Sequence, residues 1–400
     1  MDGPVRHVSD RERRARLSVR QALHPDHRLS DPVAATRATG VLHATEAATV
    51  HLAVQARTDG VDPGEVDRVL YEEKSLVKQL AMRRTLFVFP RELLPAALGS
   101  ASARVAAEQR RVVVRDVEAH GIAEDGSAWL DRARRAVLER LAGSEPVSAS
   151  QLREELPELA GTVEYAPDKA YGGATQLAPR VLTLLGAEGL VTRGPNAGHW
   201  RTSRPTWTLM ADWLGHPVEP MPAREGYAAL VRTWLSSFGP GTIEDLQWWL
   251  GSTKTAVRDA LADLAAVEVT LDHGHTGWLL PDDVDPVVEA EPSAALLPTL
   301  DPTTMGWRRR DFYLDPGSTP YLFDTNGNAG TTAWWDGRTV GAWVQDAEAA
   351  VRVVPAPGVD LGRQARAALD AEAARLTAWL DGVRISSVYS SPLMKRHRLP

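Results

Sequence analysis

Apolar residues recur at spacings of three and four through the N-terminal three quarters of the chain, and this periodicity predicts a mainly helical protein. The stretch LSDPVAATRATGVL starts a helix with Ser30 or Asp31 as the N-cap and Pro32 at the first helical position, residue types preferred at these places. A second helix is predicted over EAATVHLAVQAR, and a third starts at Asp62 and Pro63. The run AMRRTLFVFP is rich in β-forming residues and predicts a strand. Three helices followed by a strand is the element order of a winged helix-turn-helix.

The same order recurs twice further along the chain. Ser148 with Gln151, and Thr242 with Asp245, have the spacing of a capping box, in which two side chains close the first turn of a helix reciprocally. Each pair opens a short helix, which is followed by an amphipathic helix and by a β-rich stretch that folds back as a hairpin. Three such units in series predict a solenoid-like arrangement of winged helices.

Residues 294–355 have a different pattern, because short β-rich runs alternate with turn sequences such as TNGN and WDGR. This pattern predicts a small antiparallel sheet of hairpins, followed by a last helix over residues 361–380. The predicted fold class is α+β and mainly helical, with three tandem winged helix-turn-helix units and a small C-terminal β-rich part. The expected boundaries are 15–144 for the first winged helix with a helical extension, 145–215 for the second, 216–290 for the third, and 291–400 for the C-terminal part with its closing helix.

The composition is that of an ordinary globular protein. Of the 400 residues, 44% are hydrophobic and 24% are charged, and a chain of this length forms several packing units rather than one core. The sequence has no cysteine, which excludes disulfides and thiolate metal sites. The first twenty residues are charged, and no run of about 18 apolar residues occurs. We therefore expect a cytoplasmic protein without a membrane anchor and without a cofactor.

Charge is unevenly distributed along the chain. The net charge of -7 argues against a surface that is coated with positive charge. Basic residues nevertheless cluster near the N-terminus, in the middle of the chain and at its end. Such clusters are either solvated helix faces or the lining of one concave surface that binds a polyanion. The candidates for contacts to a nucleic acid are Arg83, Arg84, Arg180, Arg308, Arg309 and Arg310.

Several stretches resemble the winged-helix DNA glycosylases of the AlkZ and YcaQ type. They are VLHATEAATVHL, LVKQLAMRRTLFVFP, LLPTLDP and, downstream, NGNAG with DGRTVGAWV. They recur in the same order and at the same spacings, so the resemblance covers nearly the whole chain. Proteins similar to these have three tandem winged helices around a DNA channel and excise alkylated purines, including bulky N7-guanine adducts and interstrand cross-links. The resemblance therefore implies a DNA repair glycosylase that hydrolyses the N-glycosidic bond of an alkylated purine in duplex DNA.

The resemblance also implies a site. In that family a Gln-X-Gln or Gln-X-Asp pair, or in some members His-X-Gln, lies near the turn of the first helix-turn-helix, and the pair falls here on His43 and Thr45. Thr45 lacks the reach and the carbonyl acceptor of Gln. The strand also departs from the family pattern: it has MRRTLF where relatives tend to have MRGTLH, so Phe87 stands at the position of a histidine. His43 can bind or deprotonate a water molecule with its ordinary pKa near 6.5.

Two interpretations of this pair remain open. N7-alkylation places positive charge on the purine and weakens its glycosidic bond, so holding one water in line and stabilising an oxocarbenium-like sugar is sufficient for catalysis. The structural alternative is that His43 caps backbone groups in a turn, and that Thr45 is the N-cap of a helix that starts at Glu46. Asp301 in LLPTLDP has the same two interpretations, because it either faces the channel as a weaker catalytic candidate or caps a turn.

Other chemistry is not indicated. His273 and His275 have no third ligand nearby, and we interpret them as a polar hairpin tip rather than a metal site. Two functions therefore compete: a monofunctional DNA glycosylase, and a non-catalytic winged-helix DNA-binding protein that senses lesions or regulates transcription. The sequence has no heptad repeat that would join subunits. We expect a nucleoid-associated monomer whose partner is duplex DNA with an alkylated purine, without an obligate protein partner or a metal.

Overall fold

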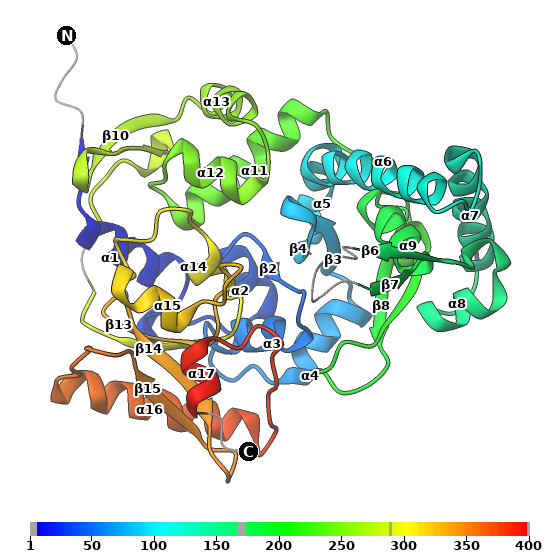
Figure 1. Ribbon diagram of the computed structural model, residues 1–400. Coiled ribbons are helices and arrows are strands. Elements are labelled where there is room, and N and C mark those ends of the chain that lie inside the picture. The colour runs from blue at the N-terminus through cyan, green and yellow to red at the C-terminus, as the bar shows by residue number, and fades with distance from the viewer. Residues whose placement is uncertain (1–5, 166–172, 288–289, 398–400) are drawn as a thin grey trace.

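The computed structural model describes residues 6–165, 173–287 and 290–397. Three units, each with helices and a small three-stranded sheet, lie next to one another, and a four-stranded sheet covered by a long helix lies below them in Figure 1. The mainly helical α+β class is thereby confirmed. Within the described ranges, no helix has the length and apolar character needed to span a membrane.

The first unit has the element order of a winged helix. Its elements are α2 (Pro32–Ala38), β2 (Leu42–His43), α3 (Ala47–Gln55), α4 (Pro63–Asp67), β3 (Leu76–Ala81) and β4 (Thr85–Pro90). The expected helix starts are confirmed, because the carboxylates of Asp31 and Asp62 cap α2 and α4 and a proline follows each. The strand order β2-β4-β3 places the short β2 beside the second strand of the hairpin, so that this hairpin positions the turn into α3.

The stretch that we expected to be a single strand is part of this hairpin. A π-helical turn over Arg68–Glu72 ends the preceding helix, and the chain then forms β3, a turn over Met82–Arg84, and β4. The turn contains no glycine, since Arg83 and Arg84 adopt left-handed backbone angles with φ of 55° and 57°. Non-glycine residues rarely adopt this conformation, so the sequence lacks the usual hairpin signal.

The second unit repeats the order of the first and adds a hairpin. Its elements are α7 (Gly126–Leu141), β5 (Val147–Ser148), α8 (Ala149–Glu155), β6 (Thr162–Tyr165), β7 (Gly173–Gln176), α9 (Ala178–Ala187), β8 (Val191–Asn196) and β9 (Pro205–Leu209), and α10 (Met210–Leu214) follows. The capping box of Ser148 and Gln151 is present at the start of α8. The strand order β5-β9-β8 matches that of the first unit.

Most of the helical extension packs on the second unit. It consists of α5 (Leu94–Ala97), α6 (Ala103–Ala119) and α7, of which α5 instead belongs to a buried cluster with Phe87 and Phe89 of β4. Val117 of α6 and Leu130 of α7 belong to one buried cluster with Leu152 and Val181 of the second unit. α7 therefore takes the place of the first helix in the packing of this unit.

The third unit is completed by the N-terminus. Its own elements are α11 (Ala223–Phe238), α12 (Ile243–Leu250), α13 (Lys254–Asp263), β10 (Val267–Leu271) and β11 (Thr276–Leu279). β1 (His7–Val8) pairs in parallel with β10, and α1 (Asp10–Arg20) follows it. In α1 the side chain of Arg16 is almost fully buried and lies 3.0 Å from the carboxylate of Asp283. This part of the N-terminal basic cluster therefore stabilises the packing of the third unit.

The C-terminal part is a sheet with the order β12-β13-β14-β15. Its elements are β12 (Ala294–Leu297), α14 (Pro302–Met305), α15 (Thr319–Leu322), β13 (Thr332–Trp335), β14 (Arg338–Gln345), β15 (Val351–Pro355), α16 (Arg363–Leu380) and α17 (Pro392–His397). Leu369 and Leu376 of α16 pack on Leu296 and Trp343 of the sheet. The expected hairpins and the last long helix are confirmed, and the red segment that leads to α17 returns to α3 of the first unit (Figure 1).

Candidate functional site

The predicted pair lies where β2 turns into α3. His43 ends β2 and is paired in register with Phe87 of β4, and the centroids of the two rings lie 5.3 Å apart in an edge-to-face arrangement. Only 7% of His43 is exposed, whereas Thr45 is exposed to solvent. The hydroxyl of Thr45 therefore lies at the surface, and the imidazole of His43 is packed against Phe87.

Burial keeps the imidazole of His43 neutral. Its removal from water, assisted by the positive charge of Arg83, lowers the pKa of His43 to about 3. The backbone N–H of Thr45 donates to Nδ1 of His43 over 3.5 Å, which assigns the proton of the neutral ring to Nε2. The expected pKa near 6.5 is therefore wrong. At neutral pH this ring can donate a hydrogen bond, but it is a weak base.

Thr45 does not cap α3, contrary to the structural alternative. The N-cap is Glu46, and no side chain makes the capping hydrogen bond. The carboxylate of Glu46 instead accepts hydrogen bonds from Oγ of Ser387 at 2.8 Å and from the backbone N–H of Val388 at 2.7 Å. Within the described part of the chain, the hydroxyl of Thr45 has no hydrogen-bond partner. It is therefore available to a ligand.

Thr45 lines a pocket of about 350 Å³ between the first and second units, which we call the Thr45 pocket. The other lining residues are Leu80, Arg84 and Leu86 of the β3–β4 hairpin, Gln109, Val112 and Val113 of α6, Pro179, Arg180 and Thr183 of α9, and Arg193 of β8. Apolar walls with a few polar groups are typical of a site for a small flat molecule, and the volume lies within the usual range of ligand pockets. The exposed hydroxyl of Thr45 therefore lies beside a space that suits a small flat molecule.

Sequence reasoning missed the residues that α6 and β8 contribute. Val105, Gln109 and Val112 share one face of α6, and Gln109 is the polar member of this otherwise apolar stripe. A polar residue in an apolar stripe is the signal that was present in the sequence. Arg193 has no comparable signal, because its place at the pocket depends on how the second unit packs on the first.

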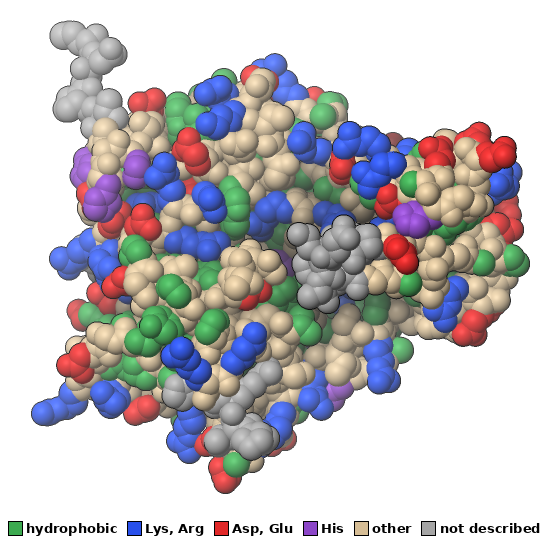
Figure 2. All heavy atoms as spheres, viewed as in Figure 1, with side chains coloured by type: hydrophobic (Ala, Val, Ile, Leu, Met, Phe, Trp, Pro, Cys, Tyr) green, Lys and Arg blue, Asp and Glu red, His purple; other side chains and the backbone are tan. Residues whose placement is uncertain are grey.

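A second pocket, of about 360 Å³, adjoins the Thr45 pocket, and the two share Arg84, Gln109 and Val112. Arg83 and Arg104 also line it. Arg84 and Arg104 are exposed, and within the described ranges neither guanidinium has a carboxylate partner. Lys and Arg side chains gather across the middle of the face shown in Figure 2, over the third unit and α6. The two pockets are therefore lined in part by arginines, among them the exposed Arg84 and Arg104.

Arg83 and Arg310 both stack on Trp248 of α12. Their guanidinium carbons lie 4.0 and 5.4 Å from the centroid of this ring system. Burial, together with the positive charge of Arg310, lowers the pKa of Arg83 to about 10, and its Nε is buried without a hydrogen-bond partner. A buried cation without a counter-ion is costly, so this place favours an anion such as a backbone phosphate.

The remaining predicted arginines differ in their surroundings. The guanidinium of Arg180 lies 2.5 Å from the carboxylate of Asp116, and Arg309 donates to Nε2 of His275 over 3.2 Å. Arg308 is exposed, and its side chain has no partner in the described ranges. The structure therefore brings together Arg83, Arg84 and Arg310, whereas Arg180 and Arg309 already have partners.

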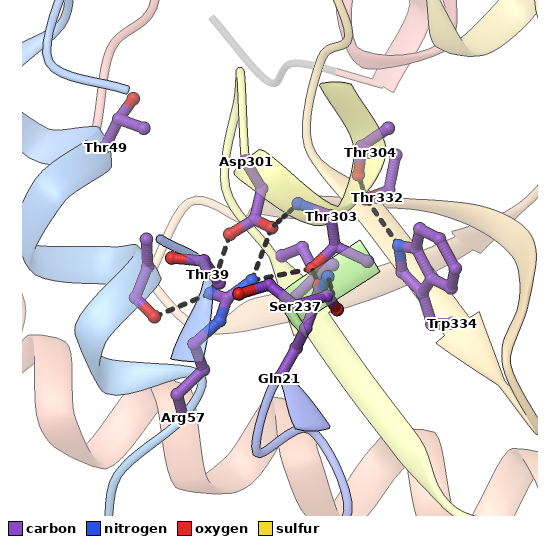
Figure 3. A network of polar contacts seen from close by, with 12 residues as sticks. Gln21, Thr39, Thr49, Arg57, Ser237, Asp301, Thr303, Thr304, Thr332 and Trp334 are labelled. Atoms are coloured by element: carbon purple, nitrogen blue, oxygen red, sulfur yellow. Dashed lines mark hydrogen bonds and ion pairs between the residues drawn. The ribbon is translucent and has the colours of Figure 1, made fainter. Parts of the chain in front are cut away.

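Asp301 is a buried structural residue. Figure 3 shows its carboxylate facing Arg57, whose two Nη atoms donate to the two carboxylate oxygens over 2.9 and 2.7 Å. Both side chains are 0% exposed. Asp301 also caps α14 by accepting the backbone N–H of Thr303 at 2.8 Å. Of its two interpretations, the structure shows the capping role, and Asp301 lines neither of the two pockets.

The two histidines of the third unit lie at the turn between β10 and β11, as the sequence indicates. His273 has a φ of 62° at the tip, and His275 faces Arg309. Within residues 6–165, 173–287 and 290–397, no group of three or more His, Asp or Glu side chains is placed to hold a metal ion.

Comparisons with known proteins agree on one family. The family described as "DNA glycosylase AlkZ-like" matches residues 36–379. An "Interstrand DNA cross-link repair glycosylase" of Streptomyces sahachiroi is 27% identical over 184 residues, a match that covers 44% of this chain and 48% of that relative. The solved structure of the DNA glycosylase AlkZ of the same organism has a similar fold, with a TM-score of 0.73 and 21% identity over 95% of this chain and 98% of that chain. The chain therefore belongs to the AlkZ-like DNA glycosylase family.

Proposed function

We propose that this protein is a monofunctional DNA glycosylase that hydrolyses the N-glycosidic bond of N7-alkylated purines in duplex DNA, including bulky N7 adducts and cross-links. The observation that carries the proposal is the exposed hydroxyl of Thr45, which lines a pocket of about 350 Å³ and lies two residues along the chain from the neutral imidazole of His43, a residue outside the pocket lining. Membership of the AlkZ-like family supports hydrolysis of this kind of bond.

The leaving purine needs little assistance from the protein. Cleavage of the bond between C1′ and N9 moves its electron pair onto the purine, which neutralises the charge that N7-alkylation created. The sugar becomes an oxocarbenium ion, a water molecule adds to C1′, and one proton leaves to solvent. A positioned water and a site without unfavourable charge are therefore the main requirements.

His43 and Thr45 suit these two requirements. The Nε2–H of His43 can donate a hydrogen bond to the oxygen of the water. The hydroxyl oxygen of Thr45 can accept a hydrogen bond from the same water. A neutral ring adds no positive charge beside a purine and a sugar that both carry it. The lowered pKa of His43 is therefore an advantage for this reaction, although it would hinder a general base.

The basic surface supports binding of a duplex. Arg83 and Arg310 on Trp248, with the exposed Arg84 and Arg308, offer positive charge next to the Thr45 pocket. Phosphate contacts of this kind fix the register of a protein on DNA without reading its sequence. We infer that the damaged nucleotide leaves the base stack and enters the Thr45 pocket, as glycosylases require for access to C1′.

A base-release assay tests the proposal. The purified protein is incubated with duplexes that carry one N7-methylguanine or one bulky N7 adduct, and free base is quantified with and without EDTA. We expect release from both duplexes, unchanged by EDTA, because water and charge stabilisation suffice. Binding to the duplexes without release of either base would contradict the proposal and favour the non-catalytic DNA-binding alternative.

A further inference from the structure

A segment near the C-terminus lies beside the candidate site. It comprises residues 383–391 between α16 and α17, and we call it the C-terminal strap (Figure 1). Glu46, the residue after Thr45, accepts two hydrogen bonds from Ser387 and Val388 of this strap. The strap is therefore attached to the first turn of α3, next to the hydroxyl that we assign to the reaction.

The strap is held at several further points. The side-chain amide of Gln345 donates to the carbonyl of Val383 at 2.9 Å, and its oxygen accepts the backbone N–H of Ile385 at 2.8 Å. Arg201, in the wing of the second unit, donates to the carbonyl of Arg384 at 2.6 Å. The first unit, the second unit and the C-terminal sheet thus all bind this segment. A segment held from three sides presents its exposed side chain in one position.

Val388 is the side chain that the strap presents. It is 86% exposed, whereas Leu190 and Met221, the other large apolar side chains that are exposed among the described residues, are 38% and 36% exposed. A single exposed apolar residue is ordinary on a protein surface. Two observations distinguish this one: its own backbone N–H is fixed by Glu46, and Glu46 adjoins Thr45. The valine is therefore held rigidly in water next to the place where a damaged nucleotide would leave the duplex.

We propose that Val388 is a wedge that enters the base stack beside the lesion and keeps the duplex open while the damaged nucleotide occupies the Thr45 pocket. Apolar side chains that separate neighbouring bases are a recurrent device of proteins that deform DNA, and the cost of unstacking is a few kcal/mol per step. The exposed Arg384, Lys395 and Arg396 on either side of Val388 add positive charge that favours a nearby phosphate backbone. This role rests on the proposed action on DNA.

Fluorescence of 2-aminopurine tests the wedge without requiring excision. The base analogue is placed next to a stable mimic of the lesion in a duplex, because its emission rises when it loses its stacking partner. We expect saturating wild-type protein to raise the emission several-fold, Val388→Ser to abolish most of this rise, and Val388→Leu to retain it. Ser386→Ala, at another exposed position of the strap, is the matched control and should behave as the wild type.

A second measurement separates this proposal from the proposed function. If the protein excises bases, Val388→Ser should lower the single-turnover rate about tenfold on paired duplex but less than twofold on the same lesion in single-stranded DNA, where no stacked partner opposes extrusion. Glu46→Ala, which releases the strap while keeping Val388, should give the same pattern. Equal 2-aminopurine emission with wild-type protein and Val388→Ser overturns the wedge, whether or not any base is released. Absence of base release with a normal rise in emission would contradict the proposed function alone.

Discussion

His43 and Phe87 face each other across two neighbouring strands, and the phenyl ring covers the imidazole edge to face at 5.3 Å between centroids. The phenyl ring is part of the apolar environment that removes His43 from water. Phe87 therefore contributes to the burial that keeps His43 neutral.

The pH dependence of excision should report this neutral state. Because the pKa of His43 is lowered to about 3, its ring does not titrate between pH 5 and pH 8. We expect the single-turnover rate of base release to stay within about twofold over this range. A rate that falls tenfold per pH unit below pH 6.5 would show instead that the ring acts as a base with an ordinary pKa.

Acid should destabilise the fold through the same residue. In the unfolded chain His43 has a pKa near 6.5, and in the folded protein the value is about 3. Its contribution to the free energy of unfolding is therefore complete above pH 6.5 and is lost as the pH falls toward 3, by about 1.4 kcal/mol per unit. Urea titrations at pH 7 and pH 5 should show a loss of stability that is smaller in His43→Gln by about 2 kcal/mol. Equal losses in both proteins would contradict a buried neutral His43.

Two substitutions at Arg84 should separate charge from backbone strain. Arg84 has a φ of 57°, a conformation that costs a non-glycine residue about 1 kcal/mol. Arg84→Ala and Arg84→Gly both remove the charge, so each should lower the slope of log affinity for duplex DNA against log salt by about one. Only Arg84→Gly relieves the strain, so its melting temperature should exceed that of Arg84→Ala. Fluorescence anisotropy at several salt concentrations and melting curves give the two quantities, and an unchanged salt slope would exclude Arg84 from DNA contact.

Loss of the Asp301 carboxylate should affect stability without affecting catalysis. Asp301→Asn leaves the guanidinium of Arg57 buried and unpaired, which typically costs about 3–5 kcal/mol. The excision rate per folded molecule should match that of the wild type, since the Asp301 carboxylate is fully buried and already bound by Arg57 and the backbone of Thr303. Asp263→Asn, which breaks the exposed pair with Arg224, is the control and should leave the denaturation midpoint unchanged. A lower excision rate per folded molecule in Asp301→Asn would show instead that Asp301 takes part in catalysis.

Local signals in the sequence predicted several helix starts of the fold. The capping boxes at Ser148 and Thr242 lie where the spacing placed them, because a capped first turn depends on residues three positions apart. The β3–β4 hairpin was not predicted, because its turn uses Arg83 and Arg84 in a conformation that usually marks glycine. The packing of α6 and α7 on the second unit was not predicted either, because periodicity alone does not show which neighbour an amphipathic helix meets.

The resemblance named His43 and Thr45, which lie at the end of β2 and in the turn that leads into α3. The pKa of His43 could not be predicted, because it depends on burial and on the charge of Arg83, which is distant in the sequence. The N-cap expected at Thr45 failed because Glu46 takes that place and binds the C-terminal strap, a contact between residues more than 300 positions apart.

Single-turnover excision by three variants tests the central claim most directly. His43→Ala should lower the rate of base release by about 10²-fold or more while duplex affinity stays nearly unchanged, because the loss falls on the transition state. His43→Gln, which restores an N–H donor, should retain most of the rate, and Thr45→Val should cost less than His43→Ala. Excision by His43→Ala at the wild-type rate would contradict a catalytic role for this pair.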